Sequence, residues 1–103
     1  MPSMASIETR VWRLIGLRGS EPGFLELSGG RLKYEPDDGP GFDVPLSDIS
    51  GVTFPWYYFS GGFKLRVRGE EYRFSFVEPH NEYADIGSGR AWGKRWKAAL
   101  LQR

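Results

Sequence analysis

The sequence predicts a mainly β domain of about seven antiparallel strands, closed by one C-terminal α-helix. Fourteen glycines and seven prolines divide the 103 residues into short segments, and most of these alternate apolar with polar residues as half-buried strands do. Only in the last segment does the spacing of the apolar residues fit a helix and not a strand. A chain of this length has room for one core, and its sixteen aromatic residues supply large apolar side chains to fill it.

The N-terminal segment is open to two interpretations. We expect residues 1–8 to form a flexible tail, so that one domain covers residues 9–103. The apolar positions of Thr9–Leu17 fit either a helix or one face of a strand. Because Gly16 interrupts this segment and Gly19–Gly23 is typical of a hairpin loop, we favour a strand that ends before that loop.

The middle of the chain is expected to contribute four strands. A tight turn at Ser28–Gly30 joins the first two, because glycine there can take a positive φ. A long turn rich in Gly, Pro and Asp follows at residues 35–41, and a one-turn connector at Leu46–Asp48 precedes the fourth strand. The predicted strands are Phe24–Leu27, Arg31–Tyr34, Phe42–Val44 and Ile49–Phe54.

The clearest hairpin joins two alternating runs at residues 63–68 and 71–76. The intervening Gly69-Glu70 suits a type II′ turn, which places Arg66 opposite Arg73. Two arginines that face one another are mildly destabilising unless a third group lies between them. A bound ligand could be that third group, so the pair favours a role in binding. This register turns a charged set of side chains outward, namely Lys64, Arg66, Arg68 and Arg73, and an apolar set inward, namely Phe63, Leu65, Val67, Tyr72, Phe74 and Phe76.

The last segment is predicted to be an amphipathic helix. Its apolar residues fall on one stripe, at Trp92, Trp96, Ala99 and Leu100, and Ser88 is expected to be the N-cap. The opposite side is basic, with Arg90, Lys94, Arg95, Lys97 and Arg103. Cations near a helix C-terminus are favoured by its dipole, so we interpret them first as a solvated face rather than as a ligand site.

Composition excludes several classes of function. Without cysteine there is no disulfide, thiol nucleophile or thiolate zinc site, and one histidine cannot supply a multi-histidine metal site. The formal net charge of +1 gives no global field for nucleic acid, which is not expected as a partner. No stretch approaches the length of a membrane span, and the N-terminal residues show no targeting signal, so we expect a cytoplasmic protein without cofactor or metal.

Two stretches resemble the pleckstrin-homology (PH) superfold, within it the small GRAM and bacterial PH-like domains. Residues 23–34 are similar to that family's glycine, alternating-apolar, turn and Arg-Leu hairpin, and residues 42–52 to its strand ending in Pro-Leu-Ser-Asp-Ile. The resemblance covers roughly residues 11–101. It implies two nearly orthogonal sheets in a partly open barrel with the helix at one end, and members that bind lipids, peptides or protein domains rather than catalyse.

One departure from the family concerns inositol phosphates. Phosphoinositide-binding relatives carry a lysine and, after a gap, a basic residue and an arginine two apart across the first two strands. The corresponding stretch here, Arg18–Leu27, has Glu21 and Glu26 where the basic pair should stand. This difference argues against inositol-phosphate recognition by that route.

The predicted binding surface combines an aromatic loop with the basic strand face. Five of the six residues in Phe54–Phe59 are aromatic, too many for so small a core, so some of Trp56, Tyr57, Tyr58 and Phe59 should be exposed. Lys64, Arg66 and Arg73 should lie beside them and orient an acidic group. A peptide-docking lip, a patch for self-association and a membrane-interface anchor all fit, as does the alternative that these rings merely close the barrel.

We therefore predict a non-catalytic interaction module that binds a protein or peptide, with peripheral binding to anionic membrane lipids as the alternative. A second alternative is a hydrolase that uses His80, the only histidine, although no nucleophile motif accompanies any serine. The acidic residues of the long turn lack the spacing of a calcium loop; they are Glu35, Asp37, Asp38 and Asp43.

Overall fold

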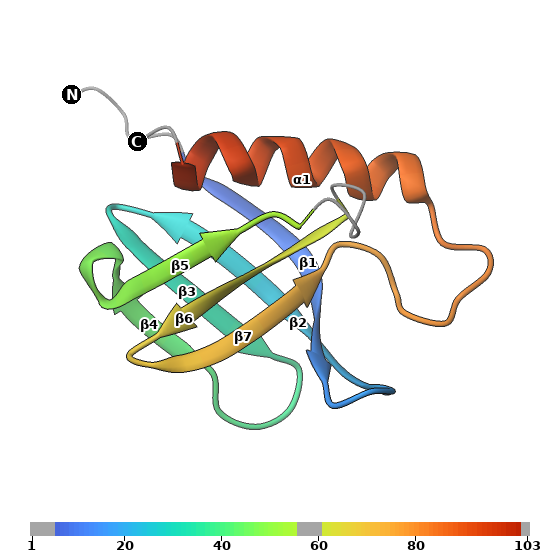
Figure 1. Ribbon diagram of the computed structural model, residues 1–103, viewed down its shortest axis with the longest axis horizontal. Helices are drawn as coiled ribbons and strands as arrows, with labels where there is room; N and C mark the ends of the chain where they lie inside the picture. Colours follow the sequence, from blue (N-terminus) through green and yellow to red (C-terminus); the bar gives the residue numbers. More distant parts are fainter. Residues whose placement is uncertain (1–5, 56–60, 102–103) are drawn as a thin grey trace.

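The computed structural model describes residues 6–55 and 61–101 of the chain (Figure 1). Seven strands, one 3₁₀ turn and one α-helix lie in these residues, so the predicted class and the C-terminal helix are confirmed. In chain order the elements are β1 (Ile7–Ile15), β2 (Gly19–Ser28), β3 (Arg31–Pro36), β4 (Phe42–Pro45), η1 (Leu46–Asp48), β5 (Ile49–Thr53), β6 (Gly62–Val67), β7 (Glu70–Ser75) and α1 (Ile86–Leu101).

The resemblance implied two nearly orthogonal sheets in a partly open barrel, and in the structure the seven strands are hydrogen-bonded into one antiparallel sheet. Its order is β4-β3-β2-β1-β7-β6-β5. The two halves are joined where Trp12 pairs with Ser75 and Arg13 with Phe74, a short contact between β1 and β7. The sheet rolls up on itself, and Figure 1 shows α1 lying across one end of the roll.

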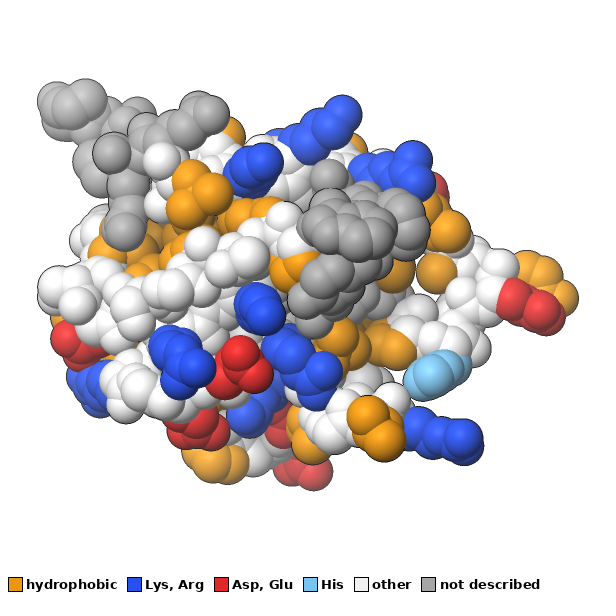
Figure 2. Space-filling model, viewed as in Figure 1, with side chains coloured by type: hydrophobic (Ala, Val, Ile, Leu, Met, Phe, Trp, Pro, Cys, Tyr) orange, Lys and Arg blue, Asp and Glu red, His pale blue; other side chains and the backbone are white. Residues whose placement is uncertain are grey.

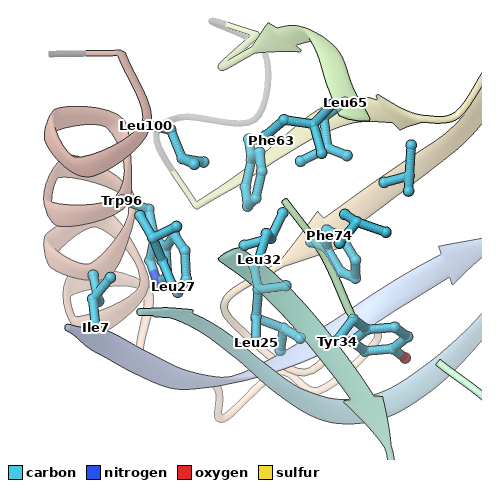
Figure 3. Packing of buried hydrophobic residues seen from close by; sticks show 14 of the residues in the cluster. Ile7, Leu25, Leu27, Leu32, Tyr34, Phe63, Leu65, Phe74, Trp96 and Leu100 are labelled. Carbon is cyan, nitrogen blue, oxygen red and sulfur yellow. The ribbon is translucent and has the colours of Figure 1, made fainter. Parts of the chain in front are cut away.

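The core lies between the inner face of the rolled sheet and α1. Trp96 and Leu100 point from the helix toward Phe63 and are almost fully buried (Figure 3). The Trp96 ring stacks on Phe63 at 6.3 Å and on Phe76 at 6.5 Å between ring centroids. Trp92 is only partly buried at the margin of this core. Burying large aromatic side chains in this way stabilises a short chain that has no cysteine and so no disulfide.

The β6–β7 hairpin turns at Arg68 and Gly69, one residue earlier than predicted. Both residues have positive φ, 52° and 88°, which is the type I′ geometry that matches the twist of paired strands. The predicted register was therefore wrong by two residues. Because a shift of two keeps every side chain on its face, the inward and outward sets survive. Lys64 now faces Arg73, and Arg66 faces Glu71.

The first strand also differs from the prediction at both ends. It starts at Ile7, which is buried and pairs with Leu27, so the predicted tail 1–8 is too long by two residues. The chain turns at residues 16–18, and Gly19–Gly23 lies in β2 rather than in a loop. Gly23 permits close approach of β3, because a Cβ there would lie 2.7 Å from the Glu35 carbonyl oxygen.

Helix α1 starts two residues before the predicted cap. Asp85 is the capping residue, since its Oδ1 accepts a hydrogen bond of 3.0 Å from the Ser88 N–H. Gly89 packs against the segment that follows β7, and a Cβ there would lie 2.6 Å from Val77 Cγ1. This close approach fixes the first turns of the helix beside the end of the sheet.

Candidate functional site: an apolar pocket beside a basic strand face

An open pocket of about 550 Å³ lies where the ends of β1, β6 and β7 meet the start of α1. Its volume is within the range of sites that bind small molecules or inserted side chains. Figure 2 shows hydrophobic side chains next to Lys and Arg side chains on this face of the molecule. The described residues that line the pocket are Leu14, Gly61, Gly62, Phe74, Ser75, Val77, Pro79, Ile86 and Arg90.

The pocket has apolar walls and one cationic group. Arg90, in the second turn of α1, is the only charged residue among the described lining residues, and no described residue forms an ion pair with it. Ser75 is occupied within its own segment, because its Oγ donates to the Val77 carbonyl at 2.7 Å and accepts from the Val77 N–H. A ligand in this pocket would therefore meet apolar surface and a single available guanidinium.

Two acidic residues of the β7–α1 loop, which also carries Glu82, lie at a different pocket. Glu78 and Asp85 line a second pocket of about 250 Å³, which also involves Trp12, and neither lines the first. Each carboxylate also has a local partner, since Glu78 accepts a hydrogen bond from Asn81 and Asp85 caps the helix. Neither Glu78 nor Asp85 therefore contributes a carboxylate to the lining of the first pocket, where Arg90 is the charged group among the described residues.

The predicted basic residues adjoin this pocket along the strands. Lys64 lies two residues beyond Gly62 on β6, and Arg73 two residues before Ser75 on β7, so both share a face with pocket-lining residues. Lys64 and Arg73 are directly opposite one another. The structure thus brings these two predicted site residues together at the edge of the pocket.

Arg73 has a structural contact as well. Its Nη2 donates to the Gly16 carbonyl at 2.8 Å and to the Leu14 carbonyl at 3.5 Å, which ties it to the end of β1 beside the pocket. Its remaining guanidinium N–H groups make no hydrogen bond to a described residue. A guanidinium held in this way is pre-organised for an acidic partner.

Arg66 and Arg68 lie nearer the hairpin turn. Arg66 is exposed, and it faces Glu71 rather than Arg73, so the predicted pair of facing arginines is absent; the like-charge pair across these strands is Lys64 with Arg73 instead. Arg68 pairs with Asp48 at 2.8 Å and is part of the structure of the turn. Of the predicted basic stripe, Lys64, Arg66 and Arg73 make no ion pair with any described residue.

Four predicted site residues lie outside the described residues: Trp56, Tyr57, Tyr58 and Phe59. The flanks of this segment are described. Phe54 stacks on Phe63 at 4.9 Å between ring centroids and packs against the core, so it does not belong to an exposed aromatic surface. On the other side, Gly61 and Gly62 line the pocket. The first described pocket residue, Gly61, is two positions after Phe59 in the sequence.

The other candidate residues of the sequence are placed apart from this pocket. His80 is exposed on the β7–α1 loop, and no described serine or carboxylate is hydrogen-bonded to it. Asp37 forms a bidentate pair with Arg10, at 2.7 and 2.6 Å, and this hydrogen bonding lowers the pKa of the Asp37 carboxyl. Asp43 pairs with Arg31 at 2.9 Å. Within residues 6–55 and 61–101, no three His, Asp or Glu side chains are grouped as metal ligands.

Sequence reasoning missed the pocket because its walls come from distant segments. Leu14, Val77, Pro79 and Ile86 belong to three different segments of the sequence, and only the fold brings them together. Arg90 was visible as part of a basic helix face, where it was interpreted as a solvated charge. Ile86 is a large apolar side chain that the structure leaves exposed at the helix start.

The comparisons with known proteins concern the fold. No protein-family model matches the chain, and no curated protein matches its sequence. Among solved structures, it is similar to the N-terminal PH domain of human ARAP2, with a TM-score of 0.66 and 16% identity over 99% of this chain and 84% of that one. The chain has the pleckstrin-homology fold.

At that identity the likeness extends to architecture and not to a ligand. The predicted resemblance to the PH superfold is thus confirmed at the level of the fold, and the narrower GRAM or bacterial branch stays a prediction. Among the described residues, no helix has the length and apolar character needed to cross a membrane.

Proposed function

We propose that this PH-fold chain is a non-catalytic interaction module that binds a protein or peptide partner at the pocket and the adjoining basic residues. The observation that carries the proposal is the apolar pocket of about 550 Å³ with Arg90 in its lining and Lys64 and Arg73 at its edge. Apolar burial in such a pocket would supply most of the affinity, and the cations would orient the partner.

The proposed surface includes the aromatic segment of the sequence prediction. Trp56, Tyr57, Tyr58 and Phe59 precede Gly61, which lines the pocket. Aromatic residues and arginine are the types enriched among residues that dominate binding energy at protein interfaces. We also propose that the chain belongs to the GRAM or bacterial PH-like branch and acts in the cytoplasm.

The experiment that tests the proposal compares proteins retained from a cell extract by the immobilised chain and by two variants. One variant, Trp56→Ala/Tyr58→Ala, removes aromatic surface, and the other, Lys64→Glu/Arg66→Glu, reverses the charge of the strand face. Lys33→Glu is the matched control, because Lys33 is exposed on β3 in the other half of the sheet.

We expect both surface variants to lose specific partners that the control keeps. Light scattering of the purified chain, with and without the same substitutions, reports whether the partner is a second copy. If both surface variants retained the same proteins and the same oligomeric state as the unsubstituted chain, this surface would not be the binding site.

Peripheral membrane binding is the second candidate function, and an exposed turn favours it. Leu17, at the β1–β2 turn, is fully exposed and is followed by the exposed Arg18. An apolar tip beside a cation can enter the interface of an anionic bilayer, with each basic residue adding about 1 kcal/mol near the surface. Salt-sensitive co-sedimentation with phosphatidylserine vesicles that is lost in Leu17→Ser/Arg18→Gln would support this function.

A further inference from the structure

Resting on the proposed function, we infer that the pocket selects a peptide segment in which a bulky apolar side chain is followed or preceded by a run of acidic residues. The apolar side chain enters the pocket, and the acidic run lies along a stripe of basic residues that begins at the pocket. Neither the PH fold nor the comparison with the ARAP2 domain specifies such a ligand.

The basic stripe runs along one side of α1. Arg90, Lys94 and Lys97 are exposed and spaced at i, i+4 and i+7, which places them on a common helix face. At 1.5 Å per residue the stripe is about 10 Å long. An extended peptide advances about 3.3 Å per residue, so about three to four acidic residues match it.

Three charged residues near this stripe, Arg95, Glu78 and Asp85, have contacts of their own. Arg95 stacks over Trp92 at 4.3 Å and so belongs to a different part of the helix surface. The acidic residues Glu78 and Asp85 line the separate pocket on the loop and have local hydrogen-bond partners. Arg90, Lys94 and Lys97 form no ion pair with any described residue.

Positive charge continues on the sheet side of the pocket. Arg73 is held by the Gly16 carbonyl and faces Lys64, so the peptide residue next to the anchor meets two further cations. Glu71, the nearest acid on the hairpin, pairs across from Arg66, and Arg66 lies four residues along β6 from Gly62, which corresponds to about 13 Å. The pocket is therefore bordered by cations on its sheet side and its helix side.

Charge complementarity thus favours an acidic segment, and the apolar lining requires an anchor. A basic segment would meet Arg90 in the pocket lining without a compensating acid, which costs affinity. A purely acidic segment without an anchor would leave the apolar walls exposed to water. The combination is what distinguishes this ligand from a generic polyanion.

The test is a selection from a random peptide library displayed on phage, followed by binding measurements on a synthetic copy of the enriched sequence. We expect enriched sequences to combine Phe, Leu or Trp with neighbouring Asp or Glu. Replacing the apolar anchor by Ala, or the acidic residues by Gln, should each weaken binding by about tenfold. Tenfold corresponds to about 1.4 kcal/mol, and hydrogen bonds to charged groups and a buried apolar side chain each contribute at least that much.

Variants of the protein locate the interaction. Arg90→Gln/Lys94→Gln should weaken binding of the synthetic peptide by about tenfold and reduce its salt dependence, whereas Lys33→Gln, on the other half of the sheet, should change it less than about twofold. Circular dichroism checks that each variant is folded. Amide chemical shifts should change most at Ser75, Val77 and the first turns of α1.

The outcomes separate this inference from the proposed function. If enriched peptides lack acidic residues, or bind Arg90→Gln/Lys94→Gln as tightly as the unsubstituted chain, the charge selectivity is wrong while peptide binding stands. If no peptide is enriched and the chain binds phosphatidylserine vesicles instead, the proposed protein-binding function is wrong as well, and the membrane alternative takes its place.

Discussion

The close contact between Gly89 and Val77 makes a quantitative prediction for Gly89→Ala. The added Cβ would lie 2.6 Å from Val77 Cγ1, whereas carbon atoms pack best at about 3.5–4.0 Å, so the overlap is about 1 Å. Relieving such an overlap costs about 1–3 kcal/mol. Replacing a glycine inside a helix by alanine stabilises the helix by about 1 kcal/mol. We therefore expect Gly89→Ala to lower the free energy of unfolding by about 1 kcal/mol, the balance of these opposing effects.

Urea and thermal unfolding followed by tryptophan fluorescence measure this loss, and about 1 kcal/mol corresponds to a Tm lower by about 4–8 °C. Gly87→Ala is the matched control, because a Cβ at Gly87 would meet its nearest atom, Asp85 Oδ1, at an ordinary 3.5 Å. That variant should be as stable as the unsubstituted chain, or more so. The reasoning would be refuted if Gly89→Ala were as stable as Gly87→Ala.

A double-mutant cycle identifies the contact responsible. Val77→Ala removes the Cγ1 atom that the new methyl would meet. We expect the stability losses of Gly89→Ala and Val77→Ala to be less than additive by about 1 kcal/mol in the double variant, a coupling within the usual range for residues in contact. Strict additivity would show that Gly89 acts through another neighbour.

Three further predictions concern the core and two polar contacts. Trp96→Ala should lower the free energy of unfolding in urea by about 3–5 kcal/mol. Trp96→Phe should lower it by less than half of that, because phenylalanine keeps an aromatic ring in the core. It also removes a buried indole N–H that has no partner among the described residues. Arg10 lowers the pKa of Asp37, so their ion pair should stabilise the folded chain above pH 3.8 and lose this effect as the pH falls further. The difference in free energy of unfolding between the unsubstituted chain and Asp37→Asn, measured across an acid titration, follows this loss. Tyr34→Phe should cost about 1 kcal/mol at neutral pH, because the hydroxyl donates to Glu21 Oε1 at 2.8 Å. Since burial raises the pKa of Tyr34 above 10.0, its contribution should persist below pH 10.0 and be lost as pH rises further, which alkaline unfolding of the two proteins measures.

The class of the fold could be predicted from the sequence because each strand has a local signal, the alternation of apolar and polar residues. Alternation in the run from Phe63 to Phe76 places the same residues in the core whether the hairpin register is right or wrong by two. The connector Leu46–Asp48 between β4 and β5 was also predicted with its bounds, since Pro45 ends the strand before it.

The positions of the turns were harder to predict, because glycine occurs both in turns and within strands that lie very close to a neighbouring strand. Gly23 was interpreted as part of a loop, whereas it lies within β2, where the neighbouring strand leaves no room for a side chain. Conversely, Arg68 takes a positive φ that a sequence pattern would not assign to arginine, and its side chain is paired with Asp48 from another segment. Such tertiary contacts override local preferences.

The candidate site was predictable only in part. Lys64 and Arg73 were identified because strand alternation turned them outward, and the fold brings them together. The pocket itself depends on how α1 and the β7–α1 loop meet the sheet, a packing of distant segments that leaves no periodic signal. From the sequence alone Arg90 is interpreted as a solvated charge. It becomes a candidate ligand-binding group only when the structure shows that it lines the pocket beside apolar residues.

The same contact that fixes the helix also shapes the proposed binding surface. Val77 lines the pocket and is the residue that Gly89 touches, while Ile86 and Arg90 on either side of Gly89 line the pocket too. A substitution that pushes the helix start away from Val77 would therefore displace Ile86 and Arg90 together. Gly89→Ala should weaken peptide binding by more than its effect on the folded fraction explains, and Gly87→Ala should not. Unchanged affinity of folded Gly89→Ala for the enriched peptide would place the ligand away from this helix terminus.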